Sequence, residues 1–584
     1  MTVSFPEDLN LADYFLFDRI AEGRGGRTAL RFGDRAWSYD EVADRARGMA
    51  RWLVERGIAP EQRVYIVLPD TPAFAWGIFG TLAAGAVLTM GNPVAPTEDL
   101  AAVIEYVRAA VVLTTPAVAA ALAPRLGELP SVREILLSPD AATGEDVEVE
   151  LAEAAEVVAA ADLAGGRMGG RAGVTSLHAA IERGRGLEVA LPKVRRDDPA
   201  IWLFTSGSTG RSKAAMHSHR DFAYNTELYA KRTVGYRESD VTVSVPRLFF
   251  GYATGTNLWF PFAVGATVGL FSERPTAESV AAAIERYRPT VVTNVPTMLG
   301  KLLDLDEERR AAGTGGAAGA AGAAGAGLDL SSVRFHLSAG EALPEPLLRR
   351  FVDRFGGEVY DGIGSAEMFH IYCSNRPGDV MPGSLGRAVE GYTLRILAED
   401  AEGPGAPELP PGEIGVLWVK GDSVAHGYFQ DRDKSWRTFH GHWCRTGDLF
   451  RIDERGYLWF SGRADDLFKV GGIFVAPREV EECLLAHSCV SVAAVIPSED
   501  AEAGLGLLKP KALIVLRPDA RERAATPEGR KQLADELKAH VQGRLSKHKY
   551  PRWVVFVDDL PKNDRGKVDK KLLIERDRRG ELAD

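Results

Sequence analysis

Short apolar, β-branched runs alternate with helical stretches along the first half of this chain. The predicted strands are residues 64–68, 110–114, 241–245, 266–270 and 290–293, and the predicted helices are residues 71–84, 116–125 and 277–287. Strands that alternate with helices are typical of βαβ units, whose connecting helices cover a parallel sheet. The pattern therefore predicts an α/β fold built on parallel sheets.

The length of 584 residues is too great for one hydrophobic core, so several domains are expected. Residues 412–460 alternate short strands with turns, which predicts a β-rich subdomain at the end of the large α/β domain. A compact α+β pattern follows, with helices 477–486 and 530–546 and strands 490–496, 511–516 and 553–557. We predict an N-terminal domain at 1–463 and a small C-terminal domain at 464–584.

Two segments have the composition of surface insertions. Residues 140–173 are rich in Ala, Glu and Gly, and residues 311–327 are almost pure Ala and Gly. Such a segment buries too little apolar surface to offset the entropy of ordering it. We expect residues 311–327 to form a mobile loop, and we assign no catalytic role to either segment.

The charge and cysteine content exclude some classes of protein. The formal net charge is −11, which argues against a nucleic-acid binder but still allows a local basic pocket for an anionic ligand. The 4 cysteines include no CxxC pair, so a zinc or thioredoxin-type motif is not supported. No signal peptide is predicted at the start, and glycines interrupt the apolar stretch 73–94 too often for a membrane span. We expect a cytoplasmic protein with reduced cysteines and no membrane insertion.

The stretch from Leu203 to Lys213 carries the strongest functional signal. An apolar run ends there in small hydroxyl and glycine residues, and a lysine closes the stretch. Glycines let the backbone approach a ligand and turn its N–H groups toward one point, which suits the oxygens of a nucleotide polyphosphate. A Walker motif fits poorly, because Gly210 and Lys213 are not adjacent. On this stretch alone, a simple Gly/Ser linker stays open.

Four further segments bring charged residues next to glycine turns. Glu367 follows Gly364, Asp448 lies in a tight loop, Arg463 and paired acids follow at 462–466, and Lys567 follows a glycine near the C-terminus. Each has an ordinary alternative: a solvated lysine in a basic tail, a surface carboxylate, an Asx-type turn or a helix cap. The order and spacing of the whole set favour the functional interpretation.

Taken together, these motifs resemble the adenylate-forming superfamily of acyl-CoA synthetases, luciferases and peptide-synthetase adenylation domains. The resemblance runs from about Pro6 to about Leu573. Residues 247–252, 337–344 and 361–371 are similar to the benzoate–CoA ligase branch.

The resemblance implies a reaction in two steps. A carboxylate attacks the α-phosphate of ATP to give an acyl-adenylate and pyrophosphate, and the thiol of coenzyme A then displaces AMP. Because a carboxylate is a weak nucleophile approaching a polyanion, catalysis has to supply positive charge and positioning. By resemblance, Lys567 bridges the carboxylate and the α-phosphate, and Glu367 holds Mg²⁺.

The resemblance also implies which residues hold the nucleotide. The residues implied to hold the phosphates are Thr205, Ser206, Gly207, Ser208, Thr209, Gly210 and Lys213. The adenine slot comprises Gly340, Glu341, Ala342, Asp361, Gly362 and Ile363. Asp448 would bind the ribose hydroxyls, with Arg463 nearby.

A rotation of the C-terminal domain between the two steps is implied in the same way, which makes this domain mobile. Asp465 matches the hinge position, where a backbone dihedral change is absorbed. The rotation would withdraw Lys567 and bring Gly471 and Gly472 to the tunnel for coenzyme A.

The acyl group would be surrounded by Gly251, Tyr252, His370 and Ile371, with Gly340 beside them. This small, aromatic set suits an aryl carboxylate, so benzoate or a hydroxy- or amino-benzoate is predicted. Relatives often carry alanine at the Gly251 position, and we expect its loss to open room for a ring substituent. Ala366 departs from the usual threonine before the magnesium-binding glutamate, which removes a hydroxyl near the α-phosphate.

Three other functions remain open at this point. One is a stand-alone aryl-AMP ligase that loads a carrier protein, and another is a catalytically weak protein that binds an aryl acid and a nucleotide, which only Ala366 favours. The third is a luciferase-type oxygenase. The sequence does not give the oligomeric state, so a homodimer also stays open.

Overall fold

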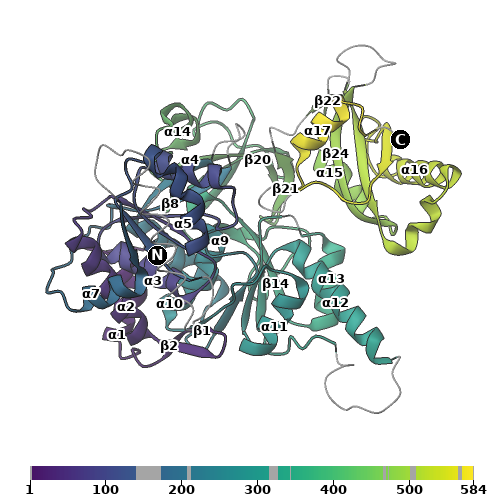
Figure 1. The fold of residues 1–584 in the computed structure, drawn as a ribbon. Coiled ribbons are helices and arrows are strands. Elements are labelled where there is room, and N and C mark those ends of the chain that lie inside the picture. Colours follow the sequence, from purple (N-terminus) through teal and green to yellow (C-terminus); the bar gives the residue numbers. More distant parts are fainter. Residues whose placement is uncertain are drawn as a thin grey trace. The chain divides into compact units, whose positions relative to one another are not determined.

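The computed structural model describes residues 3–139, 172–206, 212–314, 327–341, 343–463, 468–470, 473–475, 477–499, 508–562 and 568–582. Two compact units are present (Figure 1). The first comprises Met1–Leu394 and Val419–Arg445, and the second comprises Arg395–Trp418 and Thr446–Asp584. Mixed α/β structure with parallel sheets in the large N-terminal part confirms the predicted fold class.

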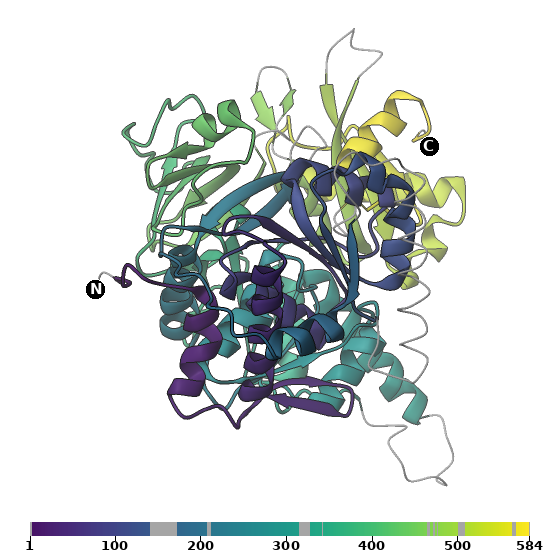
Figure 2. The ribbon, with the colours of Figure 1, turned by 60° about the vertical axis from the view of Figure 1, so that its left-hand side comes forward.

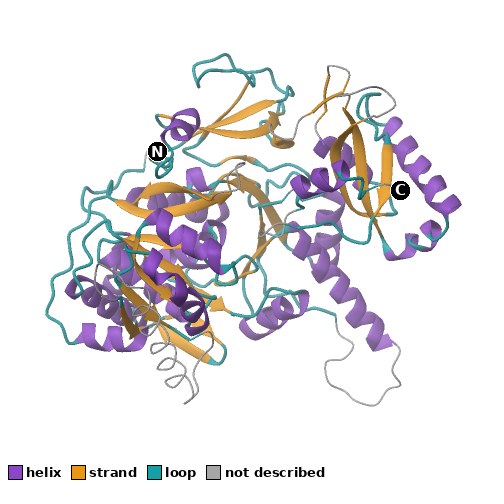
Figure 3. Cartoon of the chain, turned by 45° about the horizontal axis from the view of Figure 1, so that its top comes forward, coloured by secondary structure: helices purple, strands orange, loops and turns teal. Residues whose placement is uncertain are grey.

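A seven-stranded sheet of the first unit carries the predicted phosphate loop. Its strand order is β7-β6-β5-β3-β4-β8-β9, with β8 parallel to β4 and antiparallel to β9. The strands are β3 Arg63–Val67, β4 Val87–Met90, β5 Ala109–Thr114, β6 Glu134–Leu137, β7 Gly173–Ser176, β8 Pro199–Ser206 and β9 Ser212–Ser218. Connecting helices include α3 Pro72–Ala83, α4 Thr97–Val107 and α5 Pro116–Leu122. Helices lie around the sheets of this unit (Figure 3), as βαβ packing requires.

A nine-stranded sheet forms the other half of the first unit. Its order is β16-β15-β14-β13-β12-β10-β11-β1-β2, with the hairpin β1–β2 (purple in Figure 2) at one edge. The strands are β1 Thr28–Phe32, β2 Arg35–Ser38, β10 Val241–Ser244, β11 Thr267–Leu270, β12 Val291–Asn294, β13 Phe335–Ser338, β14 Glu358–Gly364, β15 Ile371–Ser374 and β16 Arg387–Ala388. Helices α11 Ala277–Tyr287, α12 Pro296–Thr314 and α13 Glu345–Phe355 pack on it through a core that includes Ile284, Leu299 and Phe351.

The predicted β-rich segment forms a five-stranded sheet. It contains β17 Thr393–Leu397, β18 Gly415–Lys420, β19 Phe439–His440, β20 Trp443–Ile452 and β21 Leu458–Arg463. Strands β17, β18 and β20 contribute residues to both compact units. The units therefore do not divide the chain between 463 and 464, and that predicted boundary stays a prediction.

The end of the chain has the predicted α+β pattern. Strands β24 Val490–Glu499, β25 Leu508–Leu516 and β26 Trp553–Phe556 form a three-stranded sheet, with helices α15 Pro477–Leu485, α16 Pro527–Gln542 and α17 Lys570–Arg578. Val480, Leu484 and Leu537 are fully buried in its core. A separate hairpin joins β22 Phe468–Val470 and β23 Ile473–Val475.

One predicted loop is partly helical. Residues 311–314 belong to α12, so the expectation of a loop from 311 onward is wrong for these four residues. Ala311 and Ala312, of the strongest helix-forming residue type, continue the helix there. Residues 315–326, and residues 140–171 of the other predicted insertion, lie outside the described residues. Within the described part of the chain, every helix is too short or too polar to cross a membrane.

Candidate active site

The β8–β9 hairpin places both ends of the predicted phosphate loop. Thr205 lies opposite Lys213, and Ser206 lies opposite Ser212. Since β8 runs parallel to β4, the loop lies at the carboxyl end of the parallel strands, where α/β proteins bind their ligands. Gly207, Ser208, Thr209 and Gly210 lie outside the described residues, so their roles stay predictions.

Strand β9 pairs along its other side with an extended segment near residue 427. The Met216 N–H donates to the Gly427 carbonyl (2.9 Å), and the Phe429 N–H donates to the Ala214 carbonyl (2.9 Å). This pairing brings Tyr428 and Asp431 to Lys213, whose Nζ lies 5.7 Å from the Tyr428 ring centroid and 3.9 Å from Asp431 Oδ2. The side chain of Lys213 is only 13% exposed, so its charge acts in a partly desolvated setting.

Glu367, which comes from the nine-stranded sheet, also contacts Tyr428. The Tyr428 hydroxyl donates to Glu367 Oε1 (2.7 Å), and the Ala425 N–H donates to the Glu367 carbonyl (2.8 Å). Burial, and next the Glu367 carboxylate, raise the pKa of Tyr428, so Tyr428 stays protonated and remains a donor. The structure thus brings the predicted Glu367 and Lys213 together through Tyr428, a residue that no motif in the sequence marked.

A second unpredicted contact holds the turn that carries Glu367. This turn is the 3₁₀ helix Ala366–Met368. His217, near the end of β9, has Nε2 at 2.6 Å from the Ala366 carbonyl oxygen and Nδ1 at 3.1 Å from Asp221 Oδ2. No motif marked this histidine either, because the contact joins residues 149 positions apart.

The predicted adenine residues lie at the carboxyl ends of β13 and β14. Ser338 is opposite Asp361 in this parallel pair, and its hydroxyl donates to Asp361 Oδ1 (2.7 Å). Gly340 has φ +88°, and a Cβ there would meet nothing within 4 Å, so this backbone faces open space. Glu341 Oε2 accepts from the Thr297 hydroxyl (2.7 Å), which ties it to the first turn of α12. Ala342 lies outside the described residues.

Gly362 and Ile363 continue β14 beyond Asp361 and pair with β15. A Cβ on Gly362 would lie 2.8 Å from the Cys373 carbonyl oxygen, so this close approach requires glycine. Both residues therefore lie beside Asp361, as expected if all three belong to the predicted adenine slot.

The predicted acyl residues gather around His370. This histidine is 3% exposed, and its ring lies 5.4 Å from Tyr252 and 4.7 Å from Phe260 between centroids. Its Nε2 lies 2.9 Å from the Tyr252 carbonyl oxygen and must donate to it, which leaves Nδ1 as an acceptor. Burial lowers the pKa of His370 to about 4, so the ring is neutral at physiological pH.

Two polar atoms of this cluster are buried without a hydrogen-bond partner in the described structure: His370 Nδ1 and Tyr252 Oη. Burial raises the pKa of Tyr252, so its hydroxyl keeps its proton. Ile371 follows His370 as the first residue of β15 and is buried. The cluster is therefore uncharged and largely aromatic. A ligand can form hydrogen bonds with its two unpaired polar atoms.

The room for a ring substituent expected at Gly251 stays a prediction. A Cβ on Gly251 would lie 3.1 Å from Leu203 Cδ1, a tight contact that a methyl group fits only if the Leu203 side chain shifts by a few tenths of an ångström. Leu203 comes from β8 of the other sheet, and no local pattern revealed this contact. At Gly255, a Cβ would lie 2.5 Å from the His370 ring, so glycine there lets the histidine pack on the helix backbone.

The second compact unit contains the predicted ribose residues. Asp448 lies opposite Arg463 across the antiparallel pair β20–β21. The tight loop expected at Asp448 is wrong, because Asp448 lies within strand β20; its N–H donates to the Thr446 hydroxyl (3.2 Å), and Gly447 has φ +76°. Asp465, Gly471, Gly472 and Lys567 lie outside the described residues.

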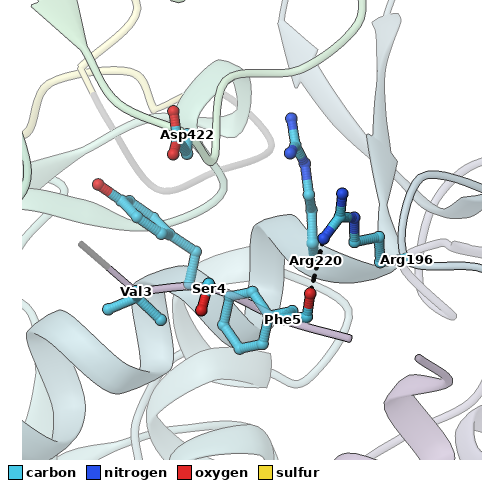
Figure 4. Close-up of a pocket in the computed structure, with 7 residues that line it drawn as sticks. Val3, Ser4, Phe5, Arg196, Arg220 and Asp422 are labelled. Carbon is cyan, nitrogen blue, oxygen red and sulfur yellow. Dashed lines mark hydrogen bonds between the residues drawn. The ribbon is translucent and has the colours of Figure 1, made fainter. Parts of the chain in front are cut away.

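A small pocket lies elsewhere in the first unit (Figure 4). It has a volume of about 150 Å³, and it is lined by Val3, Ser4, Phe5, Arg196, Arg220, Tyr224 and Asp422. None of the predicted site residues lines it. Its arginines are already engaged, because Arg196 donates to the Phe5 carbonyl (2.6 Å) and Arg220 pairs with Asp197 (3.1 Å).

Comparisons with known proteins agree with this geometry. A family model described as AMP-binding enzyme matches residues 17–429, and one described as AMP-binding enzyme C-terminal domain matches residues 479–567. The chain is 36% identical to a benzoate–CoA ligase of Thauera aromatica, over 97% of this chain and 96% of that protein. It is 35% identical to a 4-hydroxybenzoate–CoA/benzoate–CoA ligase of Rhodopseudomonas palustris, over 97% of this chain and 94% of that protein.

Among solved structures, an anthranilate CoA ligase in complex with anthranoyl-AMP matches with a TM-score of 0.82 and 31% identity. The match covers 99% of each chain.

Proposed function

Because this chain belongs to the family of AMP-binding enzymes, and within it to the benzoate–CoA ligase branch, we propose that it is an aryl-acid coenzyme A ligase. The carboxylate attacks the α-phosphate of ATP, which gives an aryl-adenylate and pyrophosphate. The thiol of coenzyme A then displaces AMP and gives the aryl-CoA thioester. The observation that carries the proposal is that Lys213 and Glu367 both contact Tyr428, beside the end of β8, in a chain similar to such ligases over nearly its whole length.

Lys213 supplies positive charge where pyrophosphate leaves. Its ammonium group lies between the Tyr428 ring and Asp431, and most of its side chain is shielded from water. A fixed charge in such a setting stabilises developing negative charge better than a mobile solvated one, because little reorganisation is needed during the reaction. Thr205, opposite Lys213, adds a hydroxyl at the other edge of the loop.

Glu367 fits the requirements of a magnesium ligand. Among the described residues, no group of three or more His, Cys, Asp or Glu side chains could form a closed metal site. Mg²⁺ bound with a nucleotide usually takes one or two protein carboxylates and completes its shell with phosphate oxygens and water. Glu367 is such a carboxylate, fixed by Tyr428, and Mg²⁺ bound there would neutralise phosphate charge.

The neutral cluster around His370 selects the acid. An aryl ring fits between aromatic side chains, and no cation in the cluster would attract a second carboxylate. We assign benzoate and its hydroxy- or amino-substituted forms as the substrate class.

The second unit supplies the remaining roles in this proposal. Asp448 and Arg463 bind the ribose, Lys567 bridges the carboxylate and the α-phosphate, and Asp465 is the hinge for domain rotation. Gly471 and Gly472 then flank the tunnel for coenzyme A, and the enzyme works in the cytoplasm.

ATP–pyrophosphate exchange with a panel of acids tests the proposal. We expect exchange with benzoate and hydroxy- or aminobenzoates, and thioester formation when coenzyme A is added. Exchange with acetate or palmitate alone would contradict the aryl assignment. Exchange without thioester formation from free coenzyme A would point instead to a carrier protein as the acceptor.

A further inference from the structure

His217 is a buried histidine whose two ring nitrogens both face oxygen acceptors. It is 1% exposed, and it lies on β9 four residues after Lys213. Nε2 lies 2.6 Å from the Ala366 carbonyl oxygen, and Nδ1 lies 3.1 Å from Asp221 Oδ2. Asp221 is also 1% exposed, so water does not substitute for either contact.

These acceptors determine where the protons lie. A neutral imidazole has one N–H and one lone pair, and a lone pair facing the Ala366 carbonyl would be repelled. Nε2 therefore carries a proton and donates to Ala366. A second proton lies between Nδ1 and Asp221, whose carboxylate also accepts from the Ser218 N–H (3.0 Å) and the Ser218 hydroxyl (2.8 Å). In either placement of this second proton, Nε2 keeps its own.

The contact joins the phosphate strand to the turn that carries Glu367. Ala366 has no polar side-chain group with which to hold this turn. The turn is also held by the Ser423 hydroxyl, which donates to the Met368 carbonyl (2.9 Å), and by Ala425 and Tyr428, near and within the segment that pairs with β9. Of these attachments, only the one from His217 comes from β9 itself, the strand that carries Lys213, among the contacts of the described residues.

We propose that His217 is the positioning residue of Glu367: its Nε2–H fixes the Ala366 carbonyl and thereby sets the Glu367 carboxylate against the phosphate strand. The inference rests on the proposed function, in which Glu367 serves the phosphates of ATP. It goes beyond that function because His217 acts only through the backbone and touches no substrate. Its loss should impair the handling of ATP and leave the aryl acid's binding intact.

Two variants separate the two hydrogen bonds of His217. In His217→Gln, the side-chain amide reaches the position of Nε2 and keeps the donation to Ala366. In His217→Asn, the shorter amide reaches the position of Nδ1 and keeps only the donation to Asp221. We expect KM for ATP in pyrophosphate exchange to rise roughly tenfold in His217→Asn, the scale of one lost strong hydrogen bond, and much less in His217→Gln. KM for benzoate should stay unchanged in both.

A matched control is His336→Gln, because His336 is another buried histidine of the same unit, bonded to Asn294 (3.0 Å). Its loss should lower thermal stability without changing KM for ATP. If His217→Asn behaves as well as His217→Gln, or if the control shows the same rise in KM, the role is only structural and the proposal is overturned.

A measurement on the unaltered protein avoids the question of whether the variants fold. ¹⁵N-histidine NMR of the ligand-free protein, with the His217 signals assigned by their loss in His217→Gln or by directed labelling, should show a protonated Nε2 in slow exchange with water. An unprotonated Nε2 would overturn the inference whatever the kinetics. Absence of any pyrophosphate exchange by the unaltered protein would instead overturn the proposed function, and the NMR result would still stand.

Discussion

The phosphate side and the acyl side of the candidate site are built in opposite ways. On the phosphate side, charged groups are held by partners: Lys213 by Asp431 and the Tyr428 ring, and Glu367 by the Tyr428 hydroxyl. On the acyl side, His370 is neutral, and two buried polar atoms lack hydrogen bonds in the described structure. On the proposed phosphate side, charged groups are therefore already positioned without ATP, and on the proposed acyl side two neutral hydrogen-bonding atoms are left for the acid.

The largest effect is expected for Glu367→Gln, which tests whether the phosphate side and the acyl side act separately. The variant keeps the size of the side chain and a hydrogen bond with Tyr428 but removes the negative charge. We expect pyrophosphate exchange to fall by about 10²- to 10³-fold, the scale of losing one preorganised electrostatic group. The dissociation constant of benzoate, measured calorimetrically without ATP, should stay within about twofold, since His370 and its neighbours are untouched. A comparable loss of benzoate binding would show that the two sides are not separate.

The pH dependence of stability tests whether the acyl side is neutral. The pKa of His370 is lowered to about 4 in the folded protein, below its ordinary value of 6.5. Its contribution to stability is therefore complete above pH 6.5 and is lost as the pH falls toward 4, because the unfolded chain then binds the extra proton. Compared with His370→Gln, the unaltered protein should lose about 2 kcal/mol more unfolding free energy between pH 6.5 and pH 5.

Denaturant unfolding of both proteins at the two pH values measures this difference. His219 and His336, whose pKa values burial lowers to about 3, shift stability in the same direction in both proteins and so cancel. An equal pH dependence in the two proteins would show that His370 is not held neutral by its surroundings.

Tyr428→Phe measures how much the hydrogen bond to Glu367 contributes on the phosphate side. The ring stays beside Lys213, but the hydroxyl that donates to Glu367 is lost. We expect kcat/KM for ATP to fall about tenfold, the value of one hydrogen bond to a charged group. Tyr252→Phe is the matched control, because its hydroxyl has no partner in the described structure, and kcat/KM for ATP should not change.

The smallest effect is expected at Gly251. In Gly251→Ala the new methyl group meets Leu203, so we expect a loss of about 1 kcal/mol in unfolding free energy and a few-fold rise in KM for benzoate. Adding Leu203→Val should relieve the crowding and recover most of both losses. If the double variant is no better than the single one, Leu203 does not close this side of the cluster.

The sequence predicted those elements whose signals are local. The helix expected at 277–287 is α11 with the same bounds, because Thr276 and Ser279 form a capping box at its start. Glu367, Asp361 and Lys213 were found because glycine turns and strand ends mark them. Glu367 follows the carboxyl end of β14, and Lys213 lies at the start of β9, opposite Thr205 near the carboxyl end of β8.

The rest depends on contacts that no local pattern encodes. His217 contacts the Ala366 carbonyl, 149 positions away, and Tyr428 reaches Lys213 through the pairing of β9 with a segment more than two hundred residues away. The close approach of Leu203, on β8, to Gly251, where a helix begins, also joins elements that no local pattern brings together. The roles of Lys567, Asp465, Gly471 and Gly472 stay predictions. Half-reaction assays of Lys567→Ala test the role of Lys567. This variant should lose adenylation but keep thioester formation from aryl-AMP.

The most direct test of attack on the α-phosphate uses benzoate labelled with ¹⁸O in both carboxylate oxygens. One labelled oxygen becomes the bridge to phosphorus in the aryl-adenylate, and it stays with AMP when the thiol displaces it. Mass spectrometry of the products should show AMP with one ¹⁸O and benzoyl-CoA with the other. Unlabelled AMP, or label in a phosphate released together with ADP, would contradict the account.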